Sequence, residues 1–252
     1  MELTDYFVEH EGAVSFTEAQ ASAFAKGIAG DFNPLHDPGS RRFCIPGDLL
    51  FCVLLNRYGI ARTTAVQFSG MLDGDTQMHL PEEAGNREFI QDSQGKALLS
   101  LALEGDRFVQ SDFISGLSEA YVKFSGQTFP DILVPLMRDA AVMINPDRPM
   151  VIYKDMAIEL AKDFAQPLGP GSQISLELTS NDMSVNGRKA AVRLSFHIKQ
   201  DGLSIGEGEK NMVLSGLRDF DEPAMQLVIQ KYQQWRDSYQ NDCSAPTVES
   251  IE

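Results

Sequence analysis

The sequence is poor in the residues on which several common classes of site depend. Its 252 residues include 3 cysteines, 4 histidines and 1 tryptophan. The cysteines, at positions 44, 52 and 243, are odd in number and have no metal-ligand spacing, so neither a disulfide framework nor a metal cluster is predicted. His10, His79 and His197 are isolated, with no carboxylate or cysteine at ligand spacing. We therefore expect no metal and no cofactor.

Positive charge is scarce as well. Lys and Arg number 21 against 36 Asp and Glu, which gives a formal net charge of −15. Such a chain is not expected to bind nucleic acid or anionic lipid nonspecifically. No apolar stretch reaches the length of a membrane span. The first residues have neither a basic start nor an apolar run, so no signal peptide is predicted and we expect a cytoplasmic protein.

Apolar residues are abundant at 43%, with 15 phenylalanines, so the chain can bury a substantial core as one large domain or two tightly joined ones. The segment from Thr17 to Gln20 has the form of a capping box, and apolar residues then recur at helical spacing as far as Ala29. Gly30 supplies a C-terminal stop. Asp31 therefore follows a helix end directly.

A second helix is predicted over Pro46–Tyr58, with Asp48 placed to complement its N-terminal dipole. Leu49 to Leu55 is apolar on every side, which predicts a helix that is buried all round. It is too short to cross a bilayer. A strongly curved sheet is the simplest structure that could enclose it.

Alternating patterns predict strands on either side of a third helix. We expect that third helix at Pro130–Ile144 and a strand before it at 119–124. The Asn186-Gly187 and Asp201-Gly202 pairs predict hairpin turns. A C-terminal helix at 222–240 should carry Leu227, Tyr232 and Trp235 on one side, followed by a disordered tail at 241–252. The other predicted strands are 63–72, 75–80, 87–92, 96–106, 150–161, 172–182, 188–200 and 203–216.

The stretch "FAKGIAGDFNPLHD", followed by "PGDLLFCVLL", resembles the MaoC-like (R)-specific enoyl-CoA hydratases of the hotdog superfamily. The match covers residues 24–55. The whole chain also resembles a family of bacterial proteins that carries only a domain-of-unknown-function label. The hotdog resemblance implies an α+β double hotdog, in which two curved antiparallel sheets each wrap a central helix. The corresponding domains would be 1–116, which contains the Asp-x-Asn-Pro-x-His motif, and 117–221, which lacks it.

Carried over residue by residue, the resemblance implies that Asp31 and His36 are the catalytic pair and that Asn33 orients their loop. The backbone N–H of Gly47 would polarise the thioester carbonyl. The chemistry is reasonable on its own terms, since adding water to an enoyl thioester needs a base, an acid and donors for the developing enolate oxygen. The implied substrate is an acyl thioester of coenzyme A or acyl carrier protein. Its phosphates would be met by Arg41, Arg42 and Arg62, which could equally be solvated surface residues.

Two departures from the family pattern keep other functions open. Only eleven positions separate His36 from Gly47, where the hydratases have a longer insertion, and Pro46-Gly47 replaces the family's His-Gly. Taken singly, Asp31 could be a polar residue following a helix and Asn33 a turn former. The alternatives are therefore a hotdog thioesterase and a non-catalytic acyl-binding or coenzyme A-binding protein. We expect a monomer that is an internal pseudo-dimer, or a homodimer.

Overall fold

The protein, described by a computed structural model over residues 1–165 and 171–244, is an α+β protein. Its helices are α1 (Glu18–Ala23), α2 (Gly47–Tyr58), α3 (Ser111–Gly126), α4 (Leu133–Asp139) and α5 (Glu222–Ser244), with the helical turns η1 (Thr4–Tyr6), η2 (Phe24–Ala29), η3 (Pro34–His36) and η4 (Thr128–Ile132). Its strands are β1 (Val8–His10), β2 (Ala13–Ser15), β3 (Ile60–Phe68), β4 (Gln77–His79), β5 (Arg87–Gln91), β6 (Ala97–Phe108), β7 (Val142–Met143), β8 (Val151–Leu160), β9 (Ile174–Asn186), β10 (Lys189–Gln200), β11 (Leu203–Ser215) and β12 (Arg218–Asp219).

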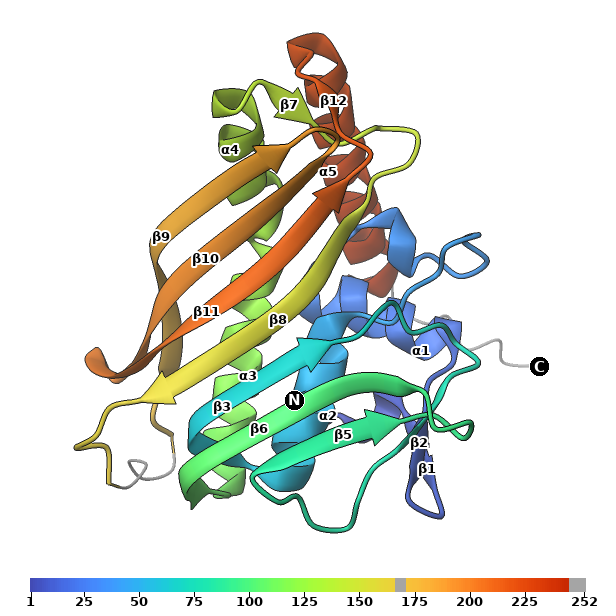
Figure 1. Cartoon of the computed structure of the whole chain (residues 1–252). Helices are drawn as coiled ribbons and strands as arrows, with labels where there is room; N and C mark the ends of the chain where they lie inside the picture. Colours follow the sequence, from blue (N-terminus) through green and yellow to red (C-terminus); the bar gives the residue numbers. More distant parts are fainter. Residues whose placement is uncertain (166–170, 245–252) are drawn as a thin grey trace.

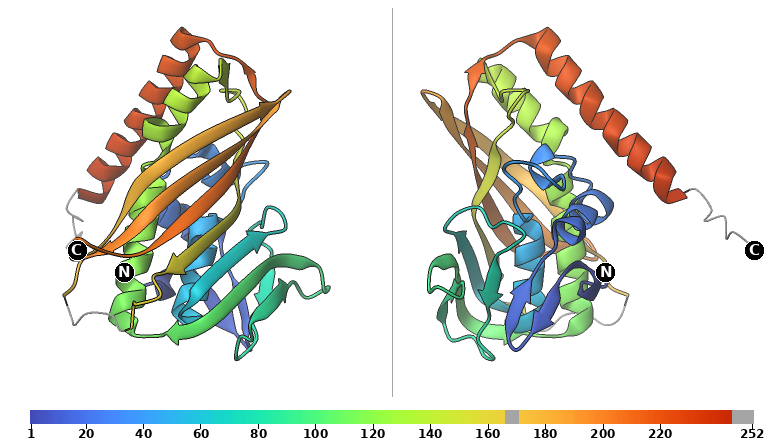
Figure 2. Two further views of the ribbon diagram at one scale, coloured as in Figure 1. Left: turned by 60° about the vertical axis from the view of Figure 1, so that its left-hand side comes forward. Right: turned by 90° about the vertical axis from the view of Figure 1, so that its right-hand side faces the viewer.

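Ten of the strands form one continuous antiparallel sheet, in the order β1-β2-β4-β5-β6-β3-β8-β11-β10-β9. The sheet halves meet where β3 pairs with β8. Figure 1 shows the sheet in front, with α2 and α3 behind it. The views in Figure 2 place α5 outermost on the same side as those helices. In the described residues no helix is both long and apolar enough to cross a membrane.

The predicted buried helix is confirmed as α2. Leu49 to Leu55 are all buried, and Pro46 is the N-cap residue. The capping box at Thr17 is also present, with Gln20 as its partner. The chain leaves the following π-helical turn η2 through Gly30, whose φ of 65° is the left-handed conformation that favours glycine. These local signals were sufficient because each depends on residues that are neighbours in sequence.

The helix predicted at Pro130–Ile144 is wrong in its bounds and in its place, and so is the strand predicted at 119–124. The helix behind the second half of the sheet is α3, which packs against both α2 and β9. Its buried side chains recur at helical spacing, as Phe113, Leu117, Tyr121 and Phe124 show. Residues 119–124 contain Tyr121, Val122 and Phe124, which are residue types common in strands, but the full sixteen-residue segment has the helical period, and burial of that face decides the outcome.

Residues 130–144 contain the end of the helical turn η4, the short helix α4 and the strand β7. Helix α4 ends at Asp139, and Ala141 then takes a left-handed φ of 53°. Strand β7 pairs with β12 in a separate two-stranded sheet. The predicted boundary between residues 116 and 117 lies within α3, so a division of the chain at that point stays a prediction.

The other four strand predictions of the second half are confirmed as β8, β9, β10 and β11, and so are its two hairpins. Asn186-Gly187 joins β9 to β10, and Asp201-Gly202 joins β10 to β11; both glycines and Asp201 have positive φ. The C-terminal helix is also confirmed as α5, which runs to Ser244 and so includes the first residues of the predicted tail. The rest of that tail lies outside the described residues, as does the side chain of Cys243.

Candidate functional site

The loop that follows η2 is held by its own side chains. Asp31 Oδ1 accepts a hydrogen bond from the backbone N–H of Asn33 at 2.9 Å. Asn33 Oδ1 in turn accepts one from the N–H of Leu35 at 3.1 Å, which caps the helical turn η3. These two bonds fold the segment tightly enough to bring His36 back toward Asp31. Asn33 is therefore a turn former that also fixes the spacing of the motif.

The structure brings Asp31 and His36 together, as the motif predicts. His36 Nε2 lies 3.6 Å from Asp31 Oδ2, and the other ring nitrogen of His36, Nδ1, lies 2.6 Å from the backbone carbonyl oxygen of Cys44. A carbonyl oxygen can only accept, so Nδ1 carries a proton and donates it. Nε2 is then the nitrogen that faces the carboxylate, and a proton there makes the ring an imidazolium.

Burial and attraction compete at this pair. Burial raises the pKa of Asp31, but its interactions with His36 and the N–H of Asn33 outweigh that effect and leave the pKa below its usual value. Burial lowers the pKa of His36, but the interaction with Asp31 prevails and the pKa lies above its usual value. Both shifts favour the ion pair over the neutral pair.

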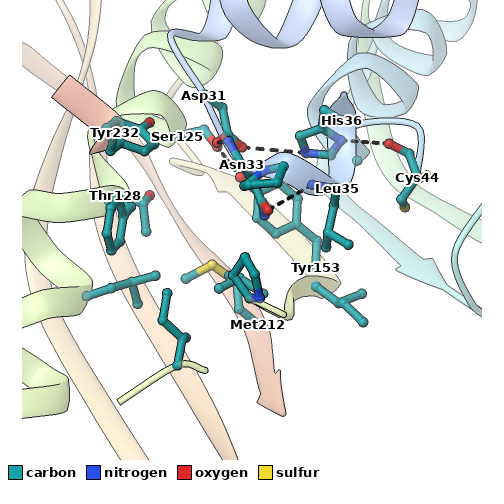
Figure 3. A pocket seen from close by; sticks show the side chains of 18 of the residues that line it. Asp31, Asn33, Leu35, His36, Cys44, Ser125, Thr128, Tyr153, Met212 and Tyr232 are labelled. Carbon is teal, nitrogen blue, oxygen red and sulfur yellow. Dashed lines mark hydrogen bonds and ion pairs between the residues drawn. The ribbon is translucent and has the colours of Figure 1, made fainter. Parts of the chain in front are cut away.

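The pair faces a cavity of about 330 Å³. Figure 3 shows Asp31, Asn33 and His36 at one end of it, with Ser125 and Tyr153 close by. Away from this end the walls are largely apolar. They are formed by Leu50, Leu72, Leu133, Ile144, Val151 and Met212, and by the α5 residues Ala224, Leu227, Val228, Tyr232 and Trp235. Leu227, Tyr232 and Trp235 thus share one face of α5, as predicted.

The N-terminus of α2 opens onto the same cavity at Gly47. The first N–H groups of a helix have no partner within the helix and carry its partial positive charge. A Cβ atom at Gly47 would lie 2.8 Å from Cδ2 of Tyr153. Glycine is therefore the residue that lets the Tyr153 ring pack against the start of the helix.

The C-terminal end of α3 completes this side of the site. A Cβ atom at Gly126 would lie only 1.6 Å from the carbonyl oxygen of Ala29, so glycine alone permits so close an approach. The contact places Ser125, the preceding residue, beside the loop that carries Asp31. Both Ser125 and Gly126 line the cavity. The half of the chain without the motif thus contributes both polar and apolar side chains to the lining of the cavity.

A buried polar network behind this wall was not predicted from the sequence. Lys210 is 0% exposed and Asp48 only 2%. Lys210 Nζ lies 3.2 Å from Asp48 Oδ1, and Asp48 Oδ2 accepts hydrogen bonds from Ser125 at 2.5 Å and Tyr153 at 3.2 Å. Burial lowers the pKa of Lys210 despite the attraction of Asp48. Asp48 is therefore a buried partner of Lys210 and not merely a first-turn residue.

A sequence signal for Lys210 existed. Along β11 the inward positions are Gly208, Lys210, Met212 and Leu214, so the lysine occupies the core face of an alternating strand. A lysine at such a position needs a buried partner. The signal could have identified the lysine, but not Asp48, which is 162 residues away in the sequence.

The predicted phosphate-binding arginines do not line the cavity. Arg41 and Arg42 are exposed on the loop after η3. Arg62 is committed elsewhere, because its guanidinium binds the Asp106 carboxylate at 2.9 Å and the carbonyl oxygens of Ala161 and Phe164. The cationic side chains that do line the cavity, apart from the motif histidine, are Arg218 and Lys231.

Comparison with protein families identifies residues 1–223 as a match to the family described as "Protein of unknown function (DUF3581)". The chain belongs to this family. The membership carries no activity with it. No curated protein matches the sequence.

Several solved structures are similar to this chain at low identity. The acyl-CoA thioesterase II TesB2 from Mycobacterium marinum is 10% identical, with 87% of this chain and 97% of that chain covered and a TM-score of 0.39. A MaoC-like dehydratase is 10% identical, with 84% and 98% covered and a TM-score of 0.39. The peroxisomal multifunctional enzyme type 2 from Drosophila melanogaster is 12% identical, with 79% and 47% covered and a TM-score of 0.41.

Proposed function

We propose that this protein adds water to an enoyl thioester, or removes it from the corresponding 3-hydroxyacyl thioester. The observation that carries the proposal is the ion pair between Asp31 and His36, 3.6 Å apart, at the polar end of a largely apolar cavity. A carboxylate and an imidazolium so placed supply the base and the acid that this reaction needs. A cavity of about 330 Å³ is in the range of small-molecule sites.

In the hydration direction Asp31 takes a proton from the attacking water as its oxygen bonds to the beta carbon. The electron pair of the double bond moves to the alpha carbon and the thioester oxygen. His36 then gives its Nε2 proton to the alpha carbon. Asp31 is now protonated and His36 neutral, and transfer of the proton from Asp31 to His36 restores the ion pair. The hydrogen bond from Nδ1 to the Cys44 carbonyl keeps Nε2 aimed at the reacting atoms throughout.

The start of α2 is the proposed site for the thioester oxygen. Gly47 lines the cavity, and the helix N-terminus offers free N–H groups and a partial positive charge. These donors stabilise the enolate oxygen more than the ground-state carbonyl. The acyl chain would extend along the apolar wall between the sheet and α5.

The same proposal includes the finer fold, a double hotdog. Its support is internal to the structure. Helix α2 lies behind the half of the sheet that contains β3, and α3 packs on β9 in the other half. The two helices contact each other, and the sheet is continuous through β3 and β8. One site per chain follows, since the Asp-x-Asn-Pro-x-His motif occurs once.

The test is the loss of conjugated enoyl absorbance with short and medium trans-2-enoyl-CoA substrates, with thiol release followed in parallel. Asp31→Asn and His36→Gln should each lower kcat by about 10²–10⁴-fold. The double variant should be little worse than either single variant, because groups that act as a unit are not additive.

Two matched controls separate chemistry from loop integrity. Asp37→Asn changes a carboxylate of the same loop whose partner is Lys26, at 2.8 Å, and it should retain activity. His10→Gln changes an exposed histidine and should do the same. Thiol release that depends on Asp31 would instead indicate a thioesterase. Absence of turnover in both assays, with folded protein and bound acyl thioester, would reject the proposal in favour of a binding protein.

A further inference from the structure

The proposed reaction leaves unused the most deeply buried ionic group of the described residues. Lys210, Asp48, Ser125 and Tyr153 form a hydrogen-bonded network (the Asp48 network) that touches the cavity only through Ser125 and Tyr153. Burying an ion pair is energetically unfavourable unless its geometry is good, so such a pair is weak evidence for a purely stabilising role. Its place beside the cavity makes a functional role the better explanation.

The hydroxyl hydrogen of Ser125 is available to a ligand, because Asp48 has more hydrogen-bond donors than it needs. Asp48 has three donors, namely Lys210 at Oδ1 and the hydroxyls of Ser125 and Tyr153 at Oδ2. If the Ser125 hydrogen turned away, the carboxylate would keep two donors. It would therefore not become an unsatisfied buried charge. The Ser125 hydroxyl can thus turn toward the cavity without leaving the Asp48 carboxylate unsatisfied.

The environment also makes this hydroxyl a strong donor. Ser125 Oγ accepts a hydrogen bond from the ammonium of Lys210, and the Tyr153 hydroxyl lies 2.7 Å away. When a hydroxyl oxygen accepts a hydrogen bond from a charged group, its own O–H bond becomes more polarised. The effect is larger in a buried site. The ammonium is held in place by the faces of two rings, with Nζ 3.4 Å from the centroid of Tyr153 and 5.4 Å from that of Tyr121.

Ser125 is also in the right place for the thioester oxygen. It hydrogen-bonds Asp48, the residue that follows Gly47, and so lies at the start of α2. Its neighbour Gly126 contacts the backbone of Ala29, two residues before Asp31. In Figure 3 the Ser125 side chain lies close to Asp31, at the same end of the cavity. A ligand that reaches Asp31 and the Gly47 N–H therefore passes Ser125.

We propose that Ser125 is a second donor to the thioester oxygen, acting together with the Gly47 N–H, and that Lys210 is the positioning residue that polarises it. This inference rests on the proposed function. In the ground state the Ser125 hydroxyl donates its hydrogen to Asp48 Oδ2. As negative charge develops on the substrate oxygen, the hydrogen turns to that oxygen while Lys210 and Tyr153 keep Asp48 satisfied. No covalent bond to Ser125 is formed.

The kinetic test compares Ser125→Ala with Ser118→Ala. Ser118 is equally buried on α3, two turns earlier, and does not line the cavity. Ser125→Ala should lower kcat about 10²–10³-fold with little change in KM, as expected for loss of one oxyanion donor. Ser118→Ala should retain wild-type kcat. Lys210→Met should lower kcat by a smaller factor than Ser125→Ala, and the double variant should resemble Ser125→Ala.

A spectroscopic test separates this inference from the proposed function. An aryl-acryloyl thioester of coenzyme A absorbs at longer wavelength when its carbonyl is polarised, and it can be bound to Asp31→Asn without turnover. Adding Ser125→Ala should reduce the red shift, and Lys210→Met should reduce it partly. A full red shift in both variants would overturn the inference even if the enzyme is a hydratase. Wild-type protein without hydratase activity would instead reject the proposed function.

Discussion

Removing the Asp48 carboxylate should destabilise the protein far more than removing an ordinary surface charge. Asp48 and Lys210 are 2% and 0% exposed, so water cannot replace the lost partner of Lys210. Breaking a buried pair from one side costs about 3–5 kcal/mol, whereas exposed pairs contribute about 0–1 kcal/mol. We expect Asp48→Ala to lower the free energy of unfolding by the larger amount.

The Lys210→Met variant should be less harmful. Asp48 would keep the hydroxyls of Ser125 and Tyr153 as donors, and methionine fills much of the lysine's volume. In the double variant both charges are gone, and Ser125 and Tyr153 can still bond each other at 2.7 Å. The double variant should therefore be more stable than Asp48→Ala alone, with a coupling free energy of about 1–3 kcal/mol.

The assay is urea unfolding followed by circular dichroism, with the slope m compared among variants so that a change in midpoint reports stability. Glu222→Ala, which removes an exposed partner of Arg138, is the control and should leave the midpoint close to that of the wild type. If Asp48→Ala lost less than about 1 kcal/mol and gained nothing from Lys210→Met, the reasoning on this buried pair would be refuted.

Four further predictions concern the site and the elements that support it. Gly126→Ala should lose about 1–3 kcal/mol of stability and most activity, because a methyl group 1.6 Å from the Ala29 carbonyl must push α3 away from the Asp31 loop; wild-type activity would contradict this contact. In Asp31→Asn the pKa of His36, measured by NMR titration, should fall from above to below its usual value. Burial lowers this pKa, and the attraction of the Asp31 carboxylate that opposes it is lost in the variant. The two pKa shifts predict that the pair stabilises the fold most between the ordinary carboxyl and imidazole values, about pH 4 to 6.5. That contribution should fade as the pH drops through the lowered Asp31 pKa or rises through the raised His36 pKa. If the difference in stability between wild type and Asp31→Asn did not vary with pH, this prediction would be wrong. Thr17→Ala should cost about 1 kcal/mol by urea unfolding through loss of the capping box, and no change would argue against the cap.

Elements with strong local signals could be predicted from the sequence. The cap at Thr17, the glycine stop at Gly30 and the uniformly apolar segment of α2 each depend on residues within a few positions of one another. The same holds for the hairpins at Asn186-Gly187 and Asp201-Gly202. The closeness of Asp31 and His36 is likewise local, because a capped turn of a few residues brings them together.

Helix α3 shows where local reasoning failed. The six residues 119–124 are rich enough in aromatic and β-branched side chains to predict a strand, and only the sixteen-residue period reveals the helix. The decision comes from outside the segment, because its apolar face is buried against α2 and β9. A short apolar window carries no information about the surface that will cover it.

By itself, the sequence determined the motif loop, the buried helix that follows it and the longer strands of the sheet, because turn chemistry and hydrophobic period act over a few residues. Only the tertiary structure decided that Lys210 faces Asp48, that Ser125 stands beside Asp31, and that α5 forms a wall of the cavity. Asp48, for example, is separated from Ser125 by 77 positions in the sequence and from Lys210 by 162. They depend on the register of ten strands and the packing of two helices, which no single residue type encodes.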